Sequence, residues 1–158
     1  MKKISSFKYV FLVLLTQTFT TLSAQKPSDI VKEQITKTLK TWNTAAKSAN
    51  VDQCMALFDD SETIMLIGSD KGEVNKGKDQ VRDWLTKIFK VASFSWEMDS
   101  INIDSNGKTA WVFVDGNMIV NFHKGGTNIT PYRFTGILVK KKGEWKWRLF
   151  DGSIPKGE

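Results

Sequence analysis

The strongest constraint on the fold is a run of alternating apolar and polar residues that fills the chain from Phe94 to Ile154. Three short turns containing glycine interrupt it, at Asn106-Gly107, Gly125-Gly126 and Lys142-Gly143. A period of two is typical of strands with one buried face, and such turns connect neighbouring antiparallel strands. The sequence therefore predicts a four-strand antiparallel meander over the second half of the chain, with strands that begin near Phe94, Thr109, Tyr132 and Glu144.

The first of these strands changes its parity part of the way along. Trp96 and Met98 alternate with polar residues, and Ile101 and Ile103 continue the alternation with the opposite parity. One extra residue near Asp99 or Ser100 accounts for the change. We therefore expect a β-bulge there, which would also bend the strand.

The first half of the chain is helical by pattern. An apolar stripe with helical spacing follows the capping residue Ser28 and continues to about Ser48. A short helix fits Val51 to Phe58, a strand Thr63 to Ile67, a polar loop Gly68 to Gly77, and a third helix Lys78 to Lys90. Three helices with one early strand, followed by a meander, predict an α+β fold with the helices on one face of the sheet.

The N-terminus has the layout of a signal peptide. Lysines at positions 2, 3 and 8 precede the apolar run from Tyr9 to Leu15, and small residues lead to Ala24. The run is far shorter than the roughly 20 apolar residues of a spanning helix. We expect residues 1–24 to be removed near Ala24 and residues 25–158 to form one exported domain, periplasmic or secreted, that does not remain in the membrane.

Charge and residue counts exclude several classes of function. Loss of the leader reduces the net charge from +6 to +3, so the basic composition predicts no nucleic-acid partner. Cys54 is the only cysteine and is expected to be a buried core thiol, while the only histidine, His123, is expected in an exposed loop. These residues cannot form a structural zinc site, and no metal and no cofactor is predicted. The segment from Gly72 to Lys78 resembles a phosphate-binding loop, but Asp79 replaces its hydroxyl residue.

Two aspartates are the candidate catalytic residues. If each turn is a two-residue loop, Ser105 faces Lys108 and Lys124 faces Thr127 across neighbouring strands. This register, with strict alternation along the last strand, turns Asp115 and Asp151 toward the aromatic face of the sheet that meets the helices. A carboxylate buried there could act as a general base. The alternative is that both are solvated carboxylates at strand ends.

Aromatic residues are the candidate ligand contacts, although residues at these spacings also pack as ordinary core. The opposite face of the sheet mixes apolar and basic residues and suits a dimer interface. The predicted pocket residues are Trp42, Phe58, Trp84, Trp96, Trp111, Phe113 and Phe134.

Three segments carry a family resemblance: "IGSDKGEVNKGKDQVRDWL" from Ile67, "KTAWVFVDG" from Lys108 and "YRFTGILVKKKGEWKWRLFDGSIP" from Tyr132. They resemble the SnoaL-like group of the nuclear transport factor 2-like superfamily. The resemblance implies a bent, cone-shaped sheet closed by three helices around a pocket, and a homodimer formed through the sheet. Members include isomerases, dehydratases, cyclases and non-catalytic binding proteins. Where relatives carry two histidines on the last strand, this chain has Leu149 and Asp151.

Three functions are compatible with these observations. The first is the binding of a small apolar molecule in the cone pocket. The second is a cofactor-free acid/base enzyme of the isomerase, dehydratase or cyclase type, which would use Asp151 or Asp115. The third is a dimeric protein-interaction module whose cone is filled by its own side chains. The sequence does not decide whether the protein is an enzyme.

Overall fold

The computed structural model describes residues 27–156, so the predicted signal peptide lies outside the described residues. Three helices and six strands make up this part of the chain. In order they are α1 (Asp29–Lys47), α2 (Val51–Met55), β1 (Met65–Ile67), β2 (Val74–Lys76), α3 (Gly77–Phe89), β3 (Ala92–Asn106), β4 (Thr109–Phe122), β5 (Thr127–Lys141) and β6 (Glu144–Ser153).

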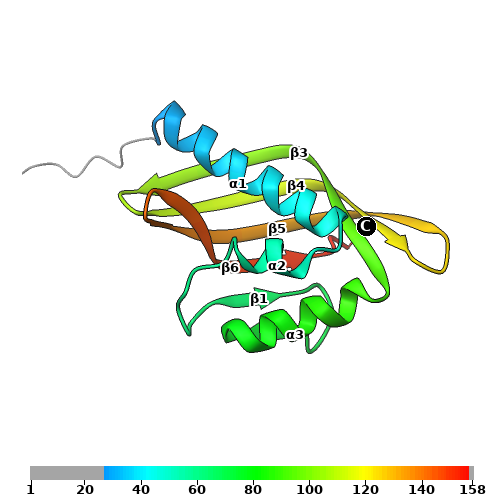
Figure 1. Cartoon of the computed structure of the whole chain (residues 1–158). Helices are drawn as coiled ribbons and strands as arrows, with labels where there is room; N and C mark the ends of the chain where they lie inside the picture. Colours follow the sequence, from blue (N-terminus) through cyan, green and yellow to red (C-terminus); the bar gives the residue numbers. More distant parts are fainter. Residues whose placement is uncertain (1–26, 157–158) are drawn as a thin grey trace, which may run out of the picture.

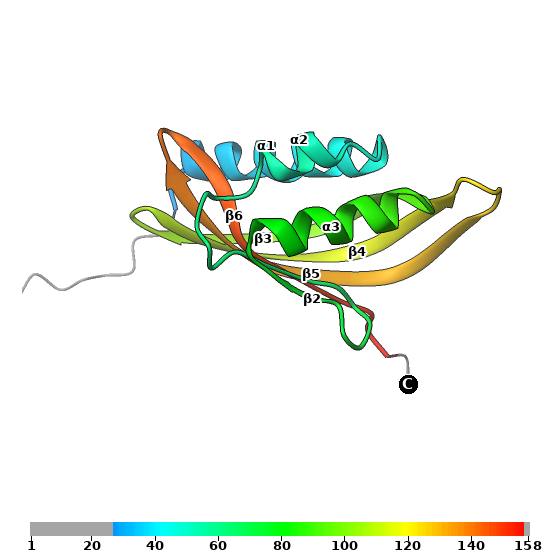
Figure 2. The same cartoon turned by 60° about the horizontal axis from the view of Figure 1, so that its bottom comes forward.

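The strands form one bent sheet in the order β2-β1-β6-β5-β4-β3. All three helices lie on its concave side, with α1 packed against β3 and β6 and α3 beside β1 (Figures 1 and 2). The predicted α+β class is confirmed, and so is the meander from β3 to β6. One detail differs, because β1 pairs in parallel with β6 and makes the sheet mixed.

The segment Gly68 to Gly77 was predicted to be a loop, and this is wrong in part. Val74–Lys76 forms β2, which pairs antiparallel with β1 so that Lys76 lies opposite Met65. A strand of only three residues is too short to produce a readable alternation. The resulting β1–β2 hairpin extends the sheet at the edge nearest α3 (Figure 1).

Helix α1 is fixed at its start and near its end. The Ser28 hydroxyl accepts a hydrogen bond from Val31 N over 3.4 Å, as expected of an N-cap. Near the other end, the Asn43 side-chain amide donates to Trp96 O over 3.0 Å and accepts from Trp96 N over 2.9 Å. This two-way bond ties α1 to β3 and sets the position of Trp96.

The predicted bulge in β3 is confirmed, between Met98 and Ser100. Gly116 of β4 lies opposite Met98, and a Cβ atom placed on it would come 1.9 Å from the Glu97 carbonyl oxygen. Glycine therefore allows β4 to pass close to the bulge, where the sheet bends.

The predicted register between β4 and β5 is wrong. Thr127 pairs with Asn121 rather than Lys124, so the connection is longer than two residues. The shift by an odd number of residues exchanges the two faces of β4. Val112 and Val114 are buried in the core, and Asp115 belongs to the opposite, convex face.

A second bulge, in β6, was not predicted. Leu138 pairs with Trp147 and Ile137 pairs with Leu149, which leaves Arg148 as an extra residue. Trp147 is therefore buried in the concave face, and the next side chain on that face is that of Phe150 rather than that of Leu149. The parity change turns Asp151 to the convex side.

The core lies between the concave face and the helices and is rich in aromatic rings. Trp147, 0% exposed, lies at its centre and packs edge-on against Trp42, Phe134 and Phe150. Cys54 is buried there as predicted, and burial raises the pKa of its thiol to about 12. The thiol therefore stays protonated at neutral pH and acts as a small apolar group.

Candidate functional site

The concave side of the sheet encloses a cavity of about 310 Å³. It is lined by residues of α1, α3, the β1–β2 hairpin and the bent strands β3 to β6. This volume is at the lower end of the range for small-molecule sites. Eight aromatic residues line it: Trp42, Trp84, Phe89, Phe94, Trp96, Phe122, Tyr132 and Phe150.

The aromatic wall is held in place by ring–ring contacts. Trp42 stacks on Trp96 with centroids 6.2 Å apart and lies 5.5 Å from Phe150. Trp96 also contacts Tyr132, at 6.4 Å. Since Asn43 fixes the backbone of Trp96, α1 and β3 position this wall together.

Polar groups reach the cavity from the β1–β2 hairpin, which contributes Ser69, Asp70 and Glu73 to its lining. Gly68 N donates to Glu73 O over 2.9 Å, and Asp70 N donates to Glu73 Oε2 over 3.1 Å. A Cβ atom on Gly68 would lie 2.0 Å from Glu73 Oε2, so the carboxylate lies directly on the glycine. Glu73 is therefore held at the cavity by the hairpin itself.

Tyr132 carries the phenol of the cavity. Its side chain comes from β5, is only 5% exposed and lies over Gly152, where a Cβ atom would come 1.8 Å from the hydroxyl. Burial raises the pKa of this phenol above its usual value of 10, and the charges of Glu73 and Asp151 raise it further. The hydroxyl therefore stays protonated and can donate a hydrogen bond.

Five of the seven predicted pocket residues belong to the cavity or to the core beside it. Trp42, Trp84 and Trp96 line the cavity as predicted. Phe58 and Phe134 are buried in the adjoining aromatic core but do not line it.

The placement of Trp111 and Phe113 in the pocket is wrong. Both lie on the convex face of β4, where Trp111 is 47% and Phe113 38% exposed. With Ile137 and Leu149 they line a groove of about 620 Å³ on that face. The longer β4–β5 connection is the cause, since it exchanges the faces of β4.

The placement of Asp115 and Asp151 on the concave face is wrong as well. Asp115 accepts a hydrogen bond from Arg133 Nε over 3.0 Å in an exposed ion pair. Asp151 is half-buried and lies opposite Thr135, which is exposed. Neither carboxylate lines the cavity.

The sequence analysis missed the polar part of the cavity. Glu73 and Asp70 fall in a segment without readable periodicity. They reach the cavity because this segment folds into a hairpin whose two strands are only three residues long. Tyr132 and Phe150 could have been found from the apolar alternation of β5 and β6, had the bulge at Arg148 been recognised.

Two further properties concern the described residues as a whole. Within residues 27–156, no group of three or more His, Cys, Asp and Glu side chains is arranged to hold a metal ion. No helix of this part of the chain is long and apolar enough to cross a membrane.

Comparison with known proteins identifies the family. The family model described as SnoaL-like domain matches residues 35–156, and the chain belongs to this family. The predicted resemblance is thereby confirmed. A search of curated proteins finds no match.

Solved structures show the same nuclear transport factor 2-like fold. One is a family member from Streptomyces avermitilis provisionally assigned as a dehydratase, with a TM-score of 0.74, 13% identity, and 82% of this chain and 100% of that chain covered. Another is a superfamily protein from Salmonella enterica, with a TM-score of 0.72, 18% identity, and coverage of 81% and 93%. A third, from Novosphingobium aromaticivorans, is provisionally assigned as a scytalone dehydratase, with a TM-score of 0.71, 18% identity, and coverage of 80% and 85%. At these identities the likeness concerns the fold alone.

Proposed function

We propose that this SnoaL-like chain is exported and binds a small, mainly apolar molecule in the cavity of its cone. The observation that carries the proposal is the cavity of about 310 Å³ with its eight aromatic lining residues. Aromatic and aliphatic walls with a few polar groups are typical of small-molecule sites. The lining side chains that carry a charge or a hydroxyl are confined to one hairpin and one phenol, and they would orient the ligand.

The cavity also weighs against the other two functions. A protein-interaction module with a filled cone would leave no such space. The acid/base enzyme predicted from the sequence would need Asp115 or Asp151 in contact with the ligand, yet neither lines the cavity. The relatives named as dehydratases share only the fold with this chain, so their names do not supply a reaction here.

Native mass spectrometry tests the proposal directly. The full chain is produced in a host that exports it and is purified gently under native conditions. We expect extra mass that leaves on denaturation, and the released molecule identifies the ligand class. A protein without bound mass that also fails to take up apolar probes would contradict the proposal. N-terminal sequencing of the same sample tests export, with Gln25 as the expected first residue.

A pair of variants tests whether the cavity is the binding site. Met118 lines the cavity, while Met98 is a half-buried methionine on neighbouring β3 that does not. Met118→Trp fills part of the cavity and should abolish the extra mass of the bound ligand in native mass spectrometry. Met98→Trp adds the same bulk outside the cavity and should leave the ligand bound. Equal effects of the two substitutions would show that the ligand binds elsewhere.

We also propose that the chain forms a homodimer through the convex face of the sheet. Trp111, Ile137 and Leu149 are paired across β4, β5 and β6, so their side chains form one apolar row. Phe113 extends it, and these residues surround the groove of about 620 Å³. Exposed aromatic residues gathered in this way on a sheet face are typical of interaction surfaces.

A further inference from the structure

We propose that the cavity selects ligands with a cationic end over anionic ones, and that Glu73 and Asp70 make this selection. The inference rests on the proposed function, because it names the charge of the molecule that the cavity holds. It assigns a specificity role to the β1–β2 hairpin, which none of the functions predicted from sequence uses.

The charged lining of the cavity has one sign. Its only charged side chains are those of Asp70 and Glu73, and no Lys, Arg or His among residues 27–156 lines it. This contrasts with the described part of the chain as a whole, in which basic residues outnumber acidic ones. An anionic ligand would therefore enter without a counter-charge, whereas a cation would meet two carboxylates.

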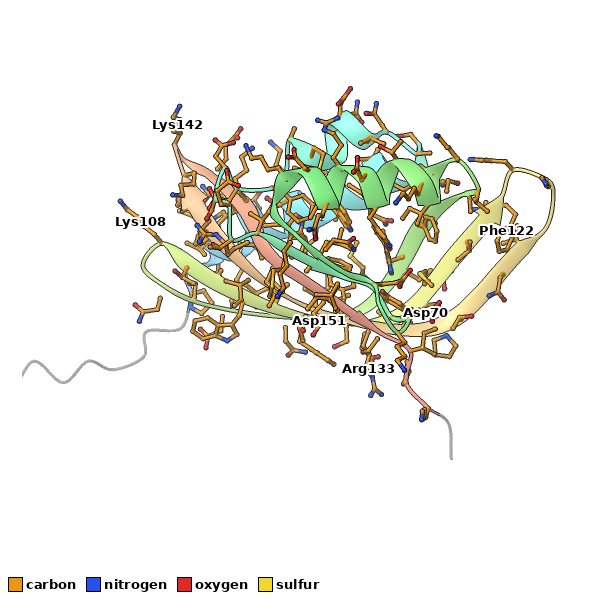
Figure 3. The ribbon with its side chains drawn as sticks, turned by 90° about the horizontal axis from the view of Figure 1, so that it is seen from below. Asp70, Lys108, Phe122, Arg133, Lys142 and Asp151 are labelled. Atoms are coloured by element: carbon orange, nitrogen blue, oxygen red, sulfur yellow. The ribbon has the colours of Figure 1, made fainter. Side chains whose placement is uncertain are left out.

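Glu73 is held toward the cavity by contacts within its own hairpin. Its carboxylate lies on Gly68, and Oε2 accepts a hydrogen bond from Asp70 N over 3.1 Å. The backbone bond from Gly68 N to Glu73 O fixes the same turn. The other carboxylate oxygen is left without a hydrogen-bond partner from the described residues. Asp70, at the tip of the hairpin (Figure 3), is exposed and also lines the cavity.

Lys71 and Arg133, which follow Asp70 and Tyr132 in the chain, lie outside the cavity. Lys71 follows Asp70 in the hairpin, but it is exposed and does not line the cavity. Arg133 lies on the convex face, where its guanidinium is paired with Asp115. The negative charges of Glu73, Asp151 and Asp70 act on Tyr132, because each of them raises the pKa of its phenol. The same charges would stabilise a positive charge beside that phenol.

The aromatic wall suits a cation as well. The faces of Trp and Tyr rings attract ammonium groups, and the attraction is strongest where water is excluded. Trp96 and Tyr132 lie next to each other in the wall, with ring centroids 6.4 Å apart. An amine attached to an apolar body would place its body among the rings deeper in the cone and its ammonium group near Glu73. The chemical class is therefore a small amphipathic amine.

Three probes with one body and three end groups test this: 4-phenylbutylamine, 4-phenylbutan-1-ol and 4-phenylbutyrate. Isothermal titration at low ionic strength and neutral pH measures each dissociation constant on the exported protein. Since two carboxylates at a partly buried site act on the end group, we expect the amine to bind about 10-fold or more tighter than the butyrate, with the alcohol between them. Amine and butyrate binding equally, or butyrate binding tighter, while the alcohol binds, would overturn the inference and leave the proposed function standing. No binding of any probe would contradict the proposed function and the inference together.

Variants locate the selectivity. Glu73→Gln combined with Asp70→Asn keeps the shape of the hairpin, and Gln can still accept the Asp70 N hydrogen bond. We expect this variant to bring the amine and the butyrate within about 3-fold of each other without changing the affinity for the alcohol. Glu33→Gln, which removes an exposed carboxylate from the outer side of α1, is the matched control and should keep the preference. A preference that survives in the hairpin variant would overturn the assignment to Glu73 and Asp70.

Discussion

Arg148 and Asp59 form an ion pair that joins β6 to the segment after α2. Arg148 Nε donates to Asp59 Oδ2 over 3.0 Å, and a second guanidinium nitrogen contacts the same carboxylate oxygen. The Asp59 side chain is 3% exposed and that of Arg148 31%. Because Arg148 is the extra residue of the bulge, its side chain can leave the row of its neighbours and reach Asp59. The ion pair therefore belongs to the bulge after which the side chains of β6 change faces.

Removal of either partner should destabilise the fold, but unequally. Arg148→Ala leaves a carboxylate buried without its main counter-charge, and we expect a loss of about 3 kcal/mol in the free energy of unfolding. Asp59→Ala leaves a guanidinium that already reaches water, so the loss should be smaller, about 1–2 kcal/mol. Urea denaturation measures both. The exposed pair of Arg133 with Asp115 is the control, and Arg133→Ala should cost less than about 1 kcal/mol. Equal losses at Arg148 and Arg133 would contradict this account.

The same bulge limits what the sequence could reveal. The helices, the meander and the bulge in β3 were predictable, because long periodic segments and a visible parity change mark them. In β6, Lys146 and Arg148 alternate with apolar residues from Trp145 to Leu149, so this stretch is read plausibly without a bulge. The partner that reveals it, Asp59, is 89 residues away. Asp151 was therefore assigned to the wrong face, and Asp115 was misplaced because the β4–β5 connection is longer than two residues, while the aromatic content of the cavity was recognised.

Gly136 illustrates a further constraint that depends on a distant contact. A Cβ atom there would lie 2.3 Å from Trp147 Cζ3 and 2.9 Å from Leu149 O. Gly136→Ala should therefore lower the free energy of unfolding by about 2–3 kcal/mol, because the most buried tryptophan has to move. Thermal or urea denaturation measures the loss. In a Trp147→Leu background the substitution should cost clearly less, and an unchanged cost there would exclude Trp147 as the cause.

Tyr132 should make stability depend on pH above 10. Burial and nearby carboxylates raise the pKa of the folded phenol above the value of 10 that applies to the unfolded chain. The protonated form is therefore favoured by folding, so its contribution is fully present below pH 10 and is lost as the pH rises above it. Without the leader, Tyr132 is the only tyrosine, so its alkaline ultraviolet difference spectrum is free of overlap. Tyr132→Phe should remove the pH dependence in this range, and a phenol that ionises near pH 10 in the folded protein would contradict the prediction.

Trp84 should matter more for binding than for folding. It is half-buried on α3 and lines the cavity, whereas Phe134 is 2% exposed in the core and does not. Trp84→Ala should weaken the binding of 4-phenylbutan-1-ol about 10-fold or more while costing less than about 2 kcal/mol of stability. Phe134→Ala should cost about 3–5 kcal/mol, as expected for a buried aromatic residue. Titration calorimetry and denaturation of both variants separate the two effects. If Trp84→Ala destabilises as much as Phe134→Ala, Trp84 belongs to the core alone.

The convex face supplies the last prediction. Trp111 lies opposite Ile137 in the register of β4 and β5, and it is the most exposed residue of the apolar row, at 47%. A second copy of the chain placed on this row would bury it, and a charge introduced there would have to be buried without a partner. Trp111→Glu should therefore convert the proposed dimer to a folded monomer, with analytical ultracentrifugation measuring the mass and circular dichroism the fold. Phe122→Glu, at an aromatic residue of similar exposure at the far end of β4, is the control and should remain dimeric. A wild-type protein that is monomeric at micromolar concentration, or a dimer that survives Trp111→Glu, would exclude this face as the interface.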